Sequence, residues 1–182
     1  MKRLFIFLCV IVFSFGFKQE SKAQFYSLST NVPMLGWTGI NGEFSATVDR
    51  TWSLHLDLSV NPFRVEKLRT QNYVFRPQVR YWFDETYRNL FVGLHYIYAN
   101  YHIGIPSIMK SKYAGWGVGG GLDVGYALPI WKNWNVEFQL GGSVMYLDYL
   151  KSECKNCGDL KKDGHGVYVL PTKAAVSLVY LF

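Results

Sequence analysis

The sequence has no apolar run long enough to cross a bilayer as a helix. Its longest run, residues 4–17, has fourteen residues, whereas a membrane-spanning helix needs about 20. No window shows the 3.6-residue periodicity of an amphipathic helix. These two absences argue against a helical membrane protein and a helical bundle, and they leave a protein built from strands.

Several chemical signatures are also missing. No stripe of basic residues argues for nucleic-acid binding, and no G-x-S-x-G turn or glycine-rich phosphate loop argues for a hydrolase or a nucleotide site. The triple glycine 119–121 lies within a predicted strand, where glycine allows another backbone to approach closely.

Residues 1–23 have the features of a secretory signal peptide. Lys2 and Arg3 precede the apolar run, and small residues at Ser21 and Ala23 suit signal peptidase. We therefore expect a cleaved signal at 1–23 and one barrel domain at 24–182. Four of the 19 basic and one of the 13 acidic residues lie in the signal, so the mature chain has a net charge of about +3.

The rest of the chain alternates between apolar and polar residues with a period of two. This period predicts strands with one apolar face. The pattern is clearest at 168–182, where Tyr168, Leu170, Val176 and Phe182 are expected on one face. The expected strands are 24–32, 38–48, 52–60, 73–83, 90–102, 116–128, 134–146 and 168–182.

The connections between these strands alternate in length. Residues 49–51, 84–89 and 129–133 are short, whereas 61–72, 103–114 and 150–167 are longer and polar. Short turns on one side and long loops on the other are typical of an eight-stranded antiparallel up-and-down barrel of the outer membrane, with both termini in the periplasm. A chain that ends on an apolar strand and Phe182 also suits the barrel-assembly machinery.

Periodicity alone does not say which face points inward. A soluble lipocalin-like barrel with an apolar ligand cavity alternates equally well. The polar face here consists mostly of Gly, Ser, Asn and Gln with a few charges of both signs, which favours a narrow lumen over a solvated exterior.

An eight-stranded barrel is just wide enough for side chains to fill it. The expected lumen charges, with His55 and His95 nearby, are Asp57, Arg76, Arg80, Asp123, Glu137 and Lys173. Buried charges need partners, so a neutralising network in a filled lumen is the favoured interpretation. A proton or solute path is the alternative.

Cys154 and Cys157 form a C-x-x-C motif in the last long connection. A disulfide is the simplest interpretation in an oxidising compartment. A zinc site with His165 and an aspartate and a redox-active pair are the alternatives. A lipid-modifying enzyme with His102 or His165 as its base is a further alternative, supported only by scattered loop Ser and Asp residues.

Five stretches resemble one known family: 76–83 (RPQVRYWF), 113–117 (YAGWG), 134–137 (WNVE), 154–158 (CKNCG) and 171–182 (PTKAAVSLVYLF). The family is DUF3575, outer-membrane β-barrels of Bacteroidota that have no assigned activity. The resemblance covers roughly 28–182, and Cys154, Cys157 and Lys173 match the family pattern. The family supplies no catalytic residues to carry over, and we expect a protein that is not an enzyme and has no cofactor. We therefore expect a barrel with a plugged lumen that contacts outer-membrane lipid and meets an extracellular or envelope protein through its loops.

Overall fold

The computed structural model describes residues 26–36, 39–62, 64–65, 68–104, 112–152 and 161–182. The expected signal peptide and the cysteine pair lie outside these residues. In the described part of the chain, no helix has the length and hydropathy to span a membrane.

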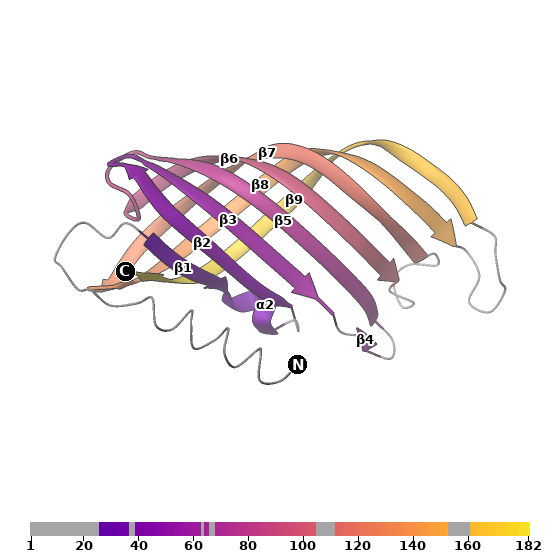
Figure 1. Cartoon of the computed structure of the whole chain (residues 1–182), viewed down its shortest axis with the longest axis horizontal. Coiled ribbons are helices and arrows are strands. Elements are labelled where there is room, and N and C mark those ends of the chain that lie inside the picture. The colour runs from indigo at the N-terminus through magenta and orange to yellow at the C-terminus, as the bar shows by residue number, and fades with distance from the viewer. Residues whose placement is uncertain (1–25, 37–38, 63, 66–67, 105–111, 153–160) are drawn as a thin grey trace, which may run out of the picture.

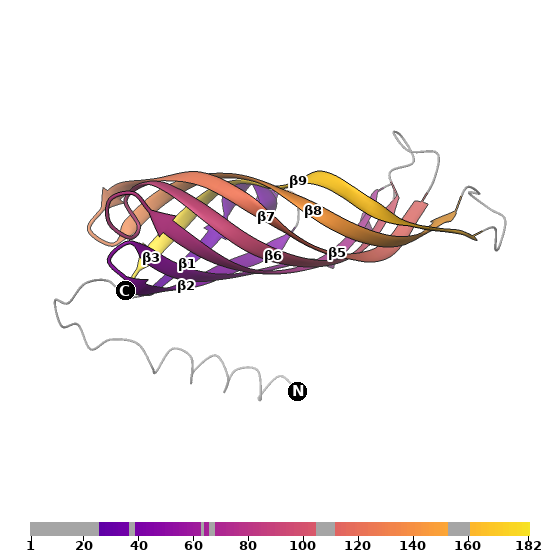
Figure 2. The same ribbon diagram turned by 90° about the horizontal axis from the view of Figure 1, so that it is seen from above.

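The chain forms a closed antiparallel barrel (Figures 1 and 2). Its eight principal strands are β1 (Tyr26–Asn31), β2 (Ile40–Asp49), β3 (Trp52–Asn61), β5 (Leu68–Trp82), β6 (Asn89–Gly104), β7 (Lys112–Trp131), β8 (Trp134–Ser152) and β9 (Lys161–Leu181). Each pairs with its sequence neighbour, β4 (Arg64–Val65) pairs only with β5, and the β1–β9 and β3–β5 pairings close the ring. The predicted eight-stranded up-and-down barrel is confirmed.

We name the two ends of the barrel by the connections they carry. At the near end lie Tyr26, Phe182 and the short turns after β2, β5 and β7; the backbones of Tyr26 and Phe182 are hydrogen-bonded there. At the far end β6 ends and β7 begins, and β7, β8 and β9 extend furthest there (Figure 1).

The strands at the far end are longer than the side-chain pattern predicts. β5 begins at Leu68, β7 at Lys112 and β9 at Lys161, and β8 continues to Ser152. The predicted long loops 61–72, 103–114 and 150–167 are correspondingly shorter. The reason is that strand pairing depends on backbone hydrogen bonds, which continue where the alternation of side chains weakens.

The alternation points its apolar face outward. On β3 the apolar residues are exposed or half-buried, whereas Ser53, His55 and Ser59 between them are buried inside the barrel. The same arrangement holds on β6, β7 and β8. In a lipocalin-like barrel the apolar face points inward, so this barrel has the reverse arrangement.

A β-bulge in β9 breaks the regular pattern predicted for 168–182. Gly141 pairs with Lys173 while the adjacent Gly142 pairs with Pro171, so Thr172 is the extra residue. One extra residue reverses the inward or outward direction of every side chain that precedes it in the strand. Tyr168 and Leu170 therefore lie on the inner surface, and the prediction that they share the outer face with Val176 is wrong.

A second departure lies after β1. Residues Val32–Gly36 form a one-turn helix, α2, where the sequence suggested the end of a strand and a loop. The helix is too short to show a helical period, so periodicity could not reveal it.

Candidate functional site

The lumen is the candidate site, and its inner surface changes character along the barrel axis. The near end holds a cluster of buried aromatic and aliphatic side chains, the middle holds charged and amide groups, and the far end holds a cavity. The three layers therefore offer different chemistry: apolar surface, charged and amide groups, and space for a ligand.

A cluster of aromatic rings lies inside the near end. Trp82 of β5 and Phe91 of β6 are fully buried, with their ring centroids 4.6 Å apart. The indole Nε1 of Trp82 donates to Ser53 Oγ at 2.7 Å, so the buried N–H is satisfied. The cluster is completed by Tyr87, Ala127, Val179 and Leu181.

Tyr87 comes from the turn between β5 and β6, which sequence analysis treated as a simple connection. The turn folds back into the barrel: Tyr87 is buried, its hydroxyl is bonded to Ser45, and its carbonyl accepts a 2.6 Å bond from Asn135 Nδ2. Tyr87 has φ of 66°, which is unusual for a bulky residue. These tertiary contacts hold the strained turn in place.

Arg80 of β5 forms the centre of the charged layer. It donates to Glu43 of β2, to Glu137 of β8 at 2.9 Å and to Gln139 at 3.1 Å. Its guanidinium carbon lies 4.5 Å from the centre of the Phe91 ring. Because Arg80 is fully buried, these carboxylates and the aromatic face replace its hydration.

Arg76 and Asp123 form a neighbouring cluster. Arg76 Nη2 donates to Asp123 Oδ1 at 3.0 Å, and the other Asp123 oxygen contacts His95 and accepts from Gln78 at 2.7 Å. His95 Nε2 is 2.6 Å from Ser143 Oγ. Both charged residues and the histidine are buried.

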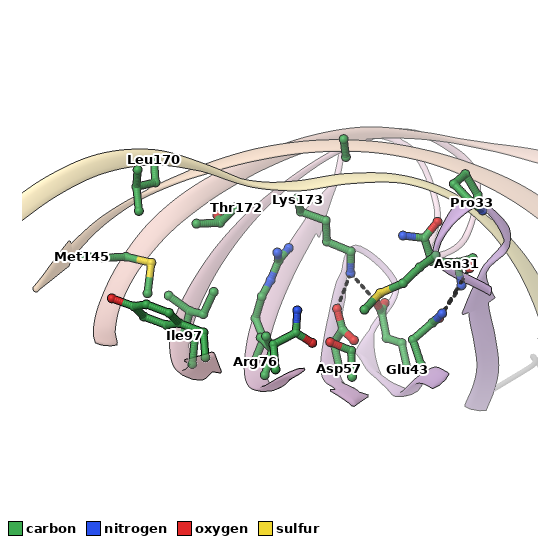
Figure 3. Close-up of a pocket in the computed structure, with 18 of the residues that line it drawn as sticks. Asn31, Pro33, Glu43, Asp57, Arg76, Ile97, Met145, Leu170, Thr172 and Lys173 are labelled. Atoms are coloured by element: carbon green, nitrogen blue, oxygen red, sulfur yellow. Dashed lines mark hydrogen bonds and ion pairs between the residues drawn. The ribbon is translucent and has the colours of Figure 1, made fainter. Parts of the chain in front are cut away.

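Lys173 of β9 joins two further strands. Its ammonium group donates to Glu43 Oε2 and Asp57 Oδ2, each at 2.7 Å (Figure 3). His55 Nδ1 also bonds Glu43 at 2.7 Å. Glu43 therefore links the Lys173 and Arg80 contacts into one network.

The six charged residues expected in the lumen all face the interior, in the two clusters just described. Sequence analysis missed Glu43, which contacts three ionisable side chains, those of His55, Arg80 and Lys173, whereas each of the six it named contacts at most two. Glu43 lies in the weak candidate strand 38–48. Extending the period of two back from Ser45 would have placed it on the inner face.

A cavity of about 840 Å³ occupies the far half of the lumen. Its lining includes Arg76, Asp57 and Lys173 toward the charged layer, apolar residues along the walls, and Pro33 and Met34 of α2 (Figure 3). The expectation of a lumen filled along its whole length is wrong for this half, because strands that extend past the charged layer present small and apolar residues inward.

Among the described residues, the other predicted groups do not come together into a site. Cys154 and Cys157 lie outside the described residues, so their disulfide, metal and redox interpretations stay predictions. His165 is exposed on β9. Within the described ranges, no group of three or more His, Cys, Asp or Glu is arranged to hold a metal ion.

The histidines considered as catalytic bases are also apart. His102 is exposed on β6, and β7 and β8 lie between it and His165 on β9. Neither has a carboxylate partner among the interactions of the described residues. The loop serines Ser107 and Ser111 lie outside the described ranges.

Comparison with known proteins identifies the family of the chain. No curated protein and no solved structure matches the chain. A family model described as "Protein of unknown function (DUF3575)" matches residues 5–182. This range includes every strand of the barrel, and the chain therefore belongs to the DUF3575 family.

Proposed function

We propose that this protein is a non-enzymatic outer-membrane β-barrel with a sealed lumen, which serves a structural or surface-interaction role through the connections at its far end. The observation that carries the proposal is the continuous apolar exterior of a closed barrel. The lumen chemistry and the strand connections support it.

The apolar exterior includes strongly exposed side chains in the middle of the strands. Leu94 of β6, Leu122 of β7 and Leu140 of β8 have exposed fractions of 62, 68 and 64%. These three strands are neighbours in the sheet. Contiguous apolar surface of this extent is rare on monomeric soluble proteins but is required on a barrel that faces lipid.

Aromatic side chains on the outer surface near both ends support the same proposal. Trp52, Trp134 and Phe182 are exposed at the near end, and Tyr73, Trp116 and Tyr146 lie farther along the barrel. Aromatic girdles of this kind sit at the two membrane–water interfaces of outer-membrane barrels. Outer-membrane lipid is thus the partner proposed for the exterior.

The interior supports a sealed barrel rather than a pore. The Trp82–Phe91–Tyr87 cluster and the Arg80 network together cross the lumen between the near-end turns and the cavity. A solute passing through would have to displace packed aromatic rings and separate buried ion pairs. A buried pair that loses one partner costs about 3–5 kcal/mol.

Heat modifiability tests membrane insertion. The outer-membrane fraction is extracted with detergent and run on a gel with and without boiling. A mobility shift on boiling, with the protein found in the membrane fraction, is expected of a closed barrel in lipid. An unshifted protein in the soluble periplasmic fraction would overturn the proposal and revive the soluble ligand-binding alternative.

Planar-bilayer recording tests the seal. The reconstituted wild-type barrel is expected to show no steady conductance, because the rings and charged groups close the near half. A matched channel-forming porin serves as the positive control. Stable ohmic steps from the wild-type protein would contradict a sealed lumen.

Epitope insertion tests which end faces outward. A tag inserted between 105 and 111 is expected to bind antibody on intact cells, whereas a tag at Lys132 and Asn133 requires permeabilised cells. The opposite result would place the far end in the periplasm. The surface role would also fail if replacing 105–111 and 153–160 with Gly-Ser linkers changed neither cell-surface binding nor envelope integrity.

A further inference from the structure

We propose that the far-end cavity is a binding site for one neutral amphiphile, a molecule with an apolar body and an uncharged hydroxyl or amide end. This goes beyond the proposed structural and surface role. The walls, the mouth and the floor of the cavity each constrain the ligand in a different way.

The walls change from polar to apolar along the same strands. On β6 the inner face passes from His95 to Ile97 and Ala99, and on β8 from Ser143 to Met145 and Leu147. Val74 and Leu170 add apolar surface from β5 and β9. A water-filled barrel mouth is ordinarily polar. The apolar walls therefore indicate that the apolar part of a ligand occupies this space.

The bulge in β9 contributes directly to these walls. Without the extra residue at Thr172, Leu170 would lie on the outside with Val176. Instead Leu170 and Tyr168 line the cavity. β-Bulges often re-aim side chains beside functional sites, and this bulge turns Tyr168 and Leu170 toward the cavity.

Tyrosines line the mouth. Tyr101, Tyr113, Tyr149 and Tyr168 lie toward the far ends of four consecutive strands. The rings of Tyr113 and Tyr149 are 5.7 Å apart, and the hydroxyls of Tyr149 and Tyr168 are 3.3 Å apart. Tyrosine presents an apolar ring with a polar tip, which suits a mouth through which an apolar body passes from water.

The floor of the cavity disfavours a charged ligand. Lys173 is held by Glu43 and Asp57 (Figure 3), and Arg76 is held by Asp123. The cavity-lining charges are thus already matched by opposite charges. A charged ligand would have to break these contacts, whereas a neutral one leaves them intact.

The floor nevertheless retains unused hydrogen-bonding capacity. Arg76 is 2% exposed, and its Nε has no hydrogen-bond partner; Asn72 Oδ1 on the same strand and Asn31 Oδ1 on β1 are also unpartnered. All three residues line the cavity. One unused donor and two unused acceptors on residues that line the same cavity match a hydroxyl or an amide, which both donates and accepts. The volume of about 840 Å³ is in the range of small-molecule sites.

Binding is tested on the full mature chain in phosphatidylcholine nanodiscs. Radiolabelled 1-monododecanoylglycerol is the test ligand, and counts retained by empty nanodiscs are subtracted. Dodecanoate and dodecylammonium have the same chain with an anionic or cationic end. We expect saturable binding of one equivalent of the neutral ligand, at least tenfold tighter than either ion. Equal or tighter binding of an ion, or no saturable binding, would overturn the proposal.

Two alanines provide matched variants. Ala99 lines the cavity, whereas Ala114 on the neighbouring strand points outward. Ala99→Trp should reduce affinity at least tenfold, and Ala114→Trp should leave it unchanged. Ala99→Phe repeats the test with a smaller side chain if the tryptophan variant does not fold, and heat modifiability verifies folding. Unchanged binding in a folded Ala99 variant would overturn the assignment.

The source of the ligand is distinguished by extracting the purified protein. A neutral lipid present in one equivalent in the wild type and absent from Ala99→Trp supports a membrane source. Saturable binding by a wild-type protein from which no lipid is extracted supports an external source. These results are separable from the proposed function, because membrane insertion is scored independently by the mobility shift.

Discussion

Arg80 on β5 and Glu137 on β8 are joined through the lumen, with Nη1 2.9 Å from Oε2. In the ring, β6 and β7 lie between these two strands, so the contact ties one part of the wall to another that is not its neighbour. It lies beside the aromatic cluster inside the near end, because the Arg80 guanidinium carbon is 4.5 Å from the centre of the Phe91 ring. Buried charges and buried rings therefore pack together in this part of the lumen.

Removing the positive charge of Arg80 should destabilise the folded barrel. Arg80→Leu leaves Glu43 and Glu137 buried without their shared partner and is expected to lower the free energy of unfolding by about 3–5 kcal/mol. Urea titration in lipid vesicles, followed by tryptophan fluorescence, measures the change. Arg50→Leu removes an exposed ion pair with Glu85 and should cost about 0–1 kcal/mol. Equal costs for the two variants would contradict a central role for Arg80.

An arginine on the outer face tests contact with lipid. Leu122→Arg places a charge in the middle of β7 and should destabilise the folded barrel in vesicles by about 2–4 kcal/mol. His102→Arg, at an exposed position toward the far end of β6, should cost about 0–1 kcal/mol. The same urea titration measures both. A membrane exterior would be contradicted by equal costs at the two positions.

Close packing inside the near end predicts a strong effect at one glycine. A Cβ on Gly125 would overlap the Phe91 ring and the Phe138 carbonyl, whereas a Cβ on Gly42 meets nothing within 4 Å. Gly125→Ala should therefore destabilise the barrel by about 1–3 kcal/mol through overpacking. Gly42→Ala should be neutral or slightly stabilising. A neutral Gly125→Ala would show that this layer is loosely packed.

Spin labels test the bulge in β9. Single cysteines replace Val169, Leu170 or Val176 in a Cys154→Ser, Cys157→Ser background, and collisions with oxygen report exposure to lipid. Val169, which is 80% exposed, and Val176 should be accessible, whereas Leu170 should be protected by the lumen. A regular strand without the bulge would instead make Leu170 match Val176 and protect Val169.

The sequence by itself determined the architecture of this protein. A strict alternation such as that of β3, where Leu54, Leu56 and Leu58 alternate with His55 and Asp57, is sufficient to predict a strand and its two faces. Repeated eight times between turns, it predicted the closed barrel. The composition of the polar face also indicated correctly that this face points inward.

The tertiary structure alone decided what the interior contains. Which charges meet depends on strand register and on the diameter of the ring, so Glu43 gained its central position from contacts with Arg80 on β5 and Lys173 on β9. The inward fold of Tyr87 rests on bonds to Ser45 and Asn135, far away in sequence. The bulge at Thr172 is one residue of extra length, which leaves the local alternation almost unchanged and yet reverses the faces of the strand before it.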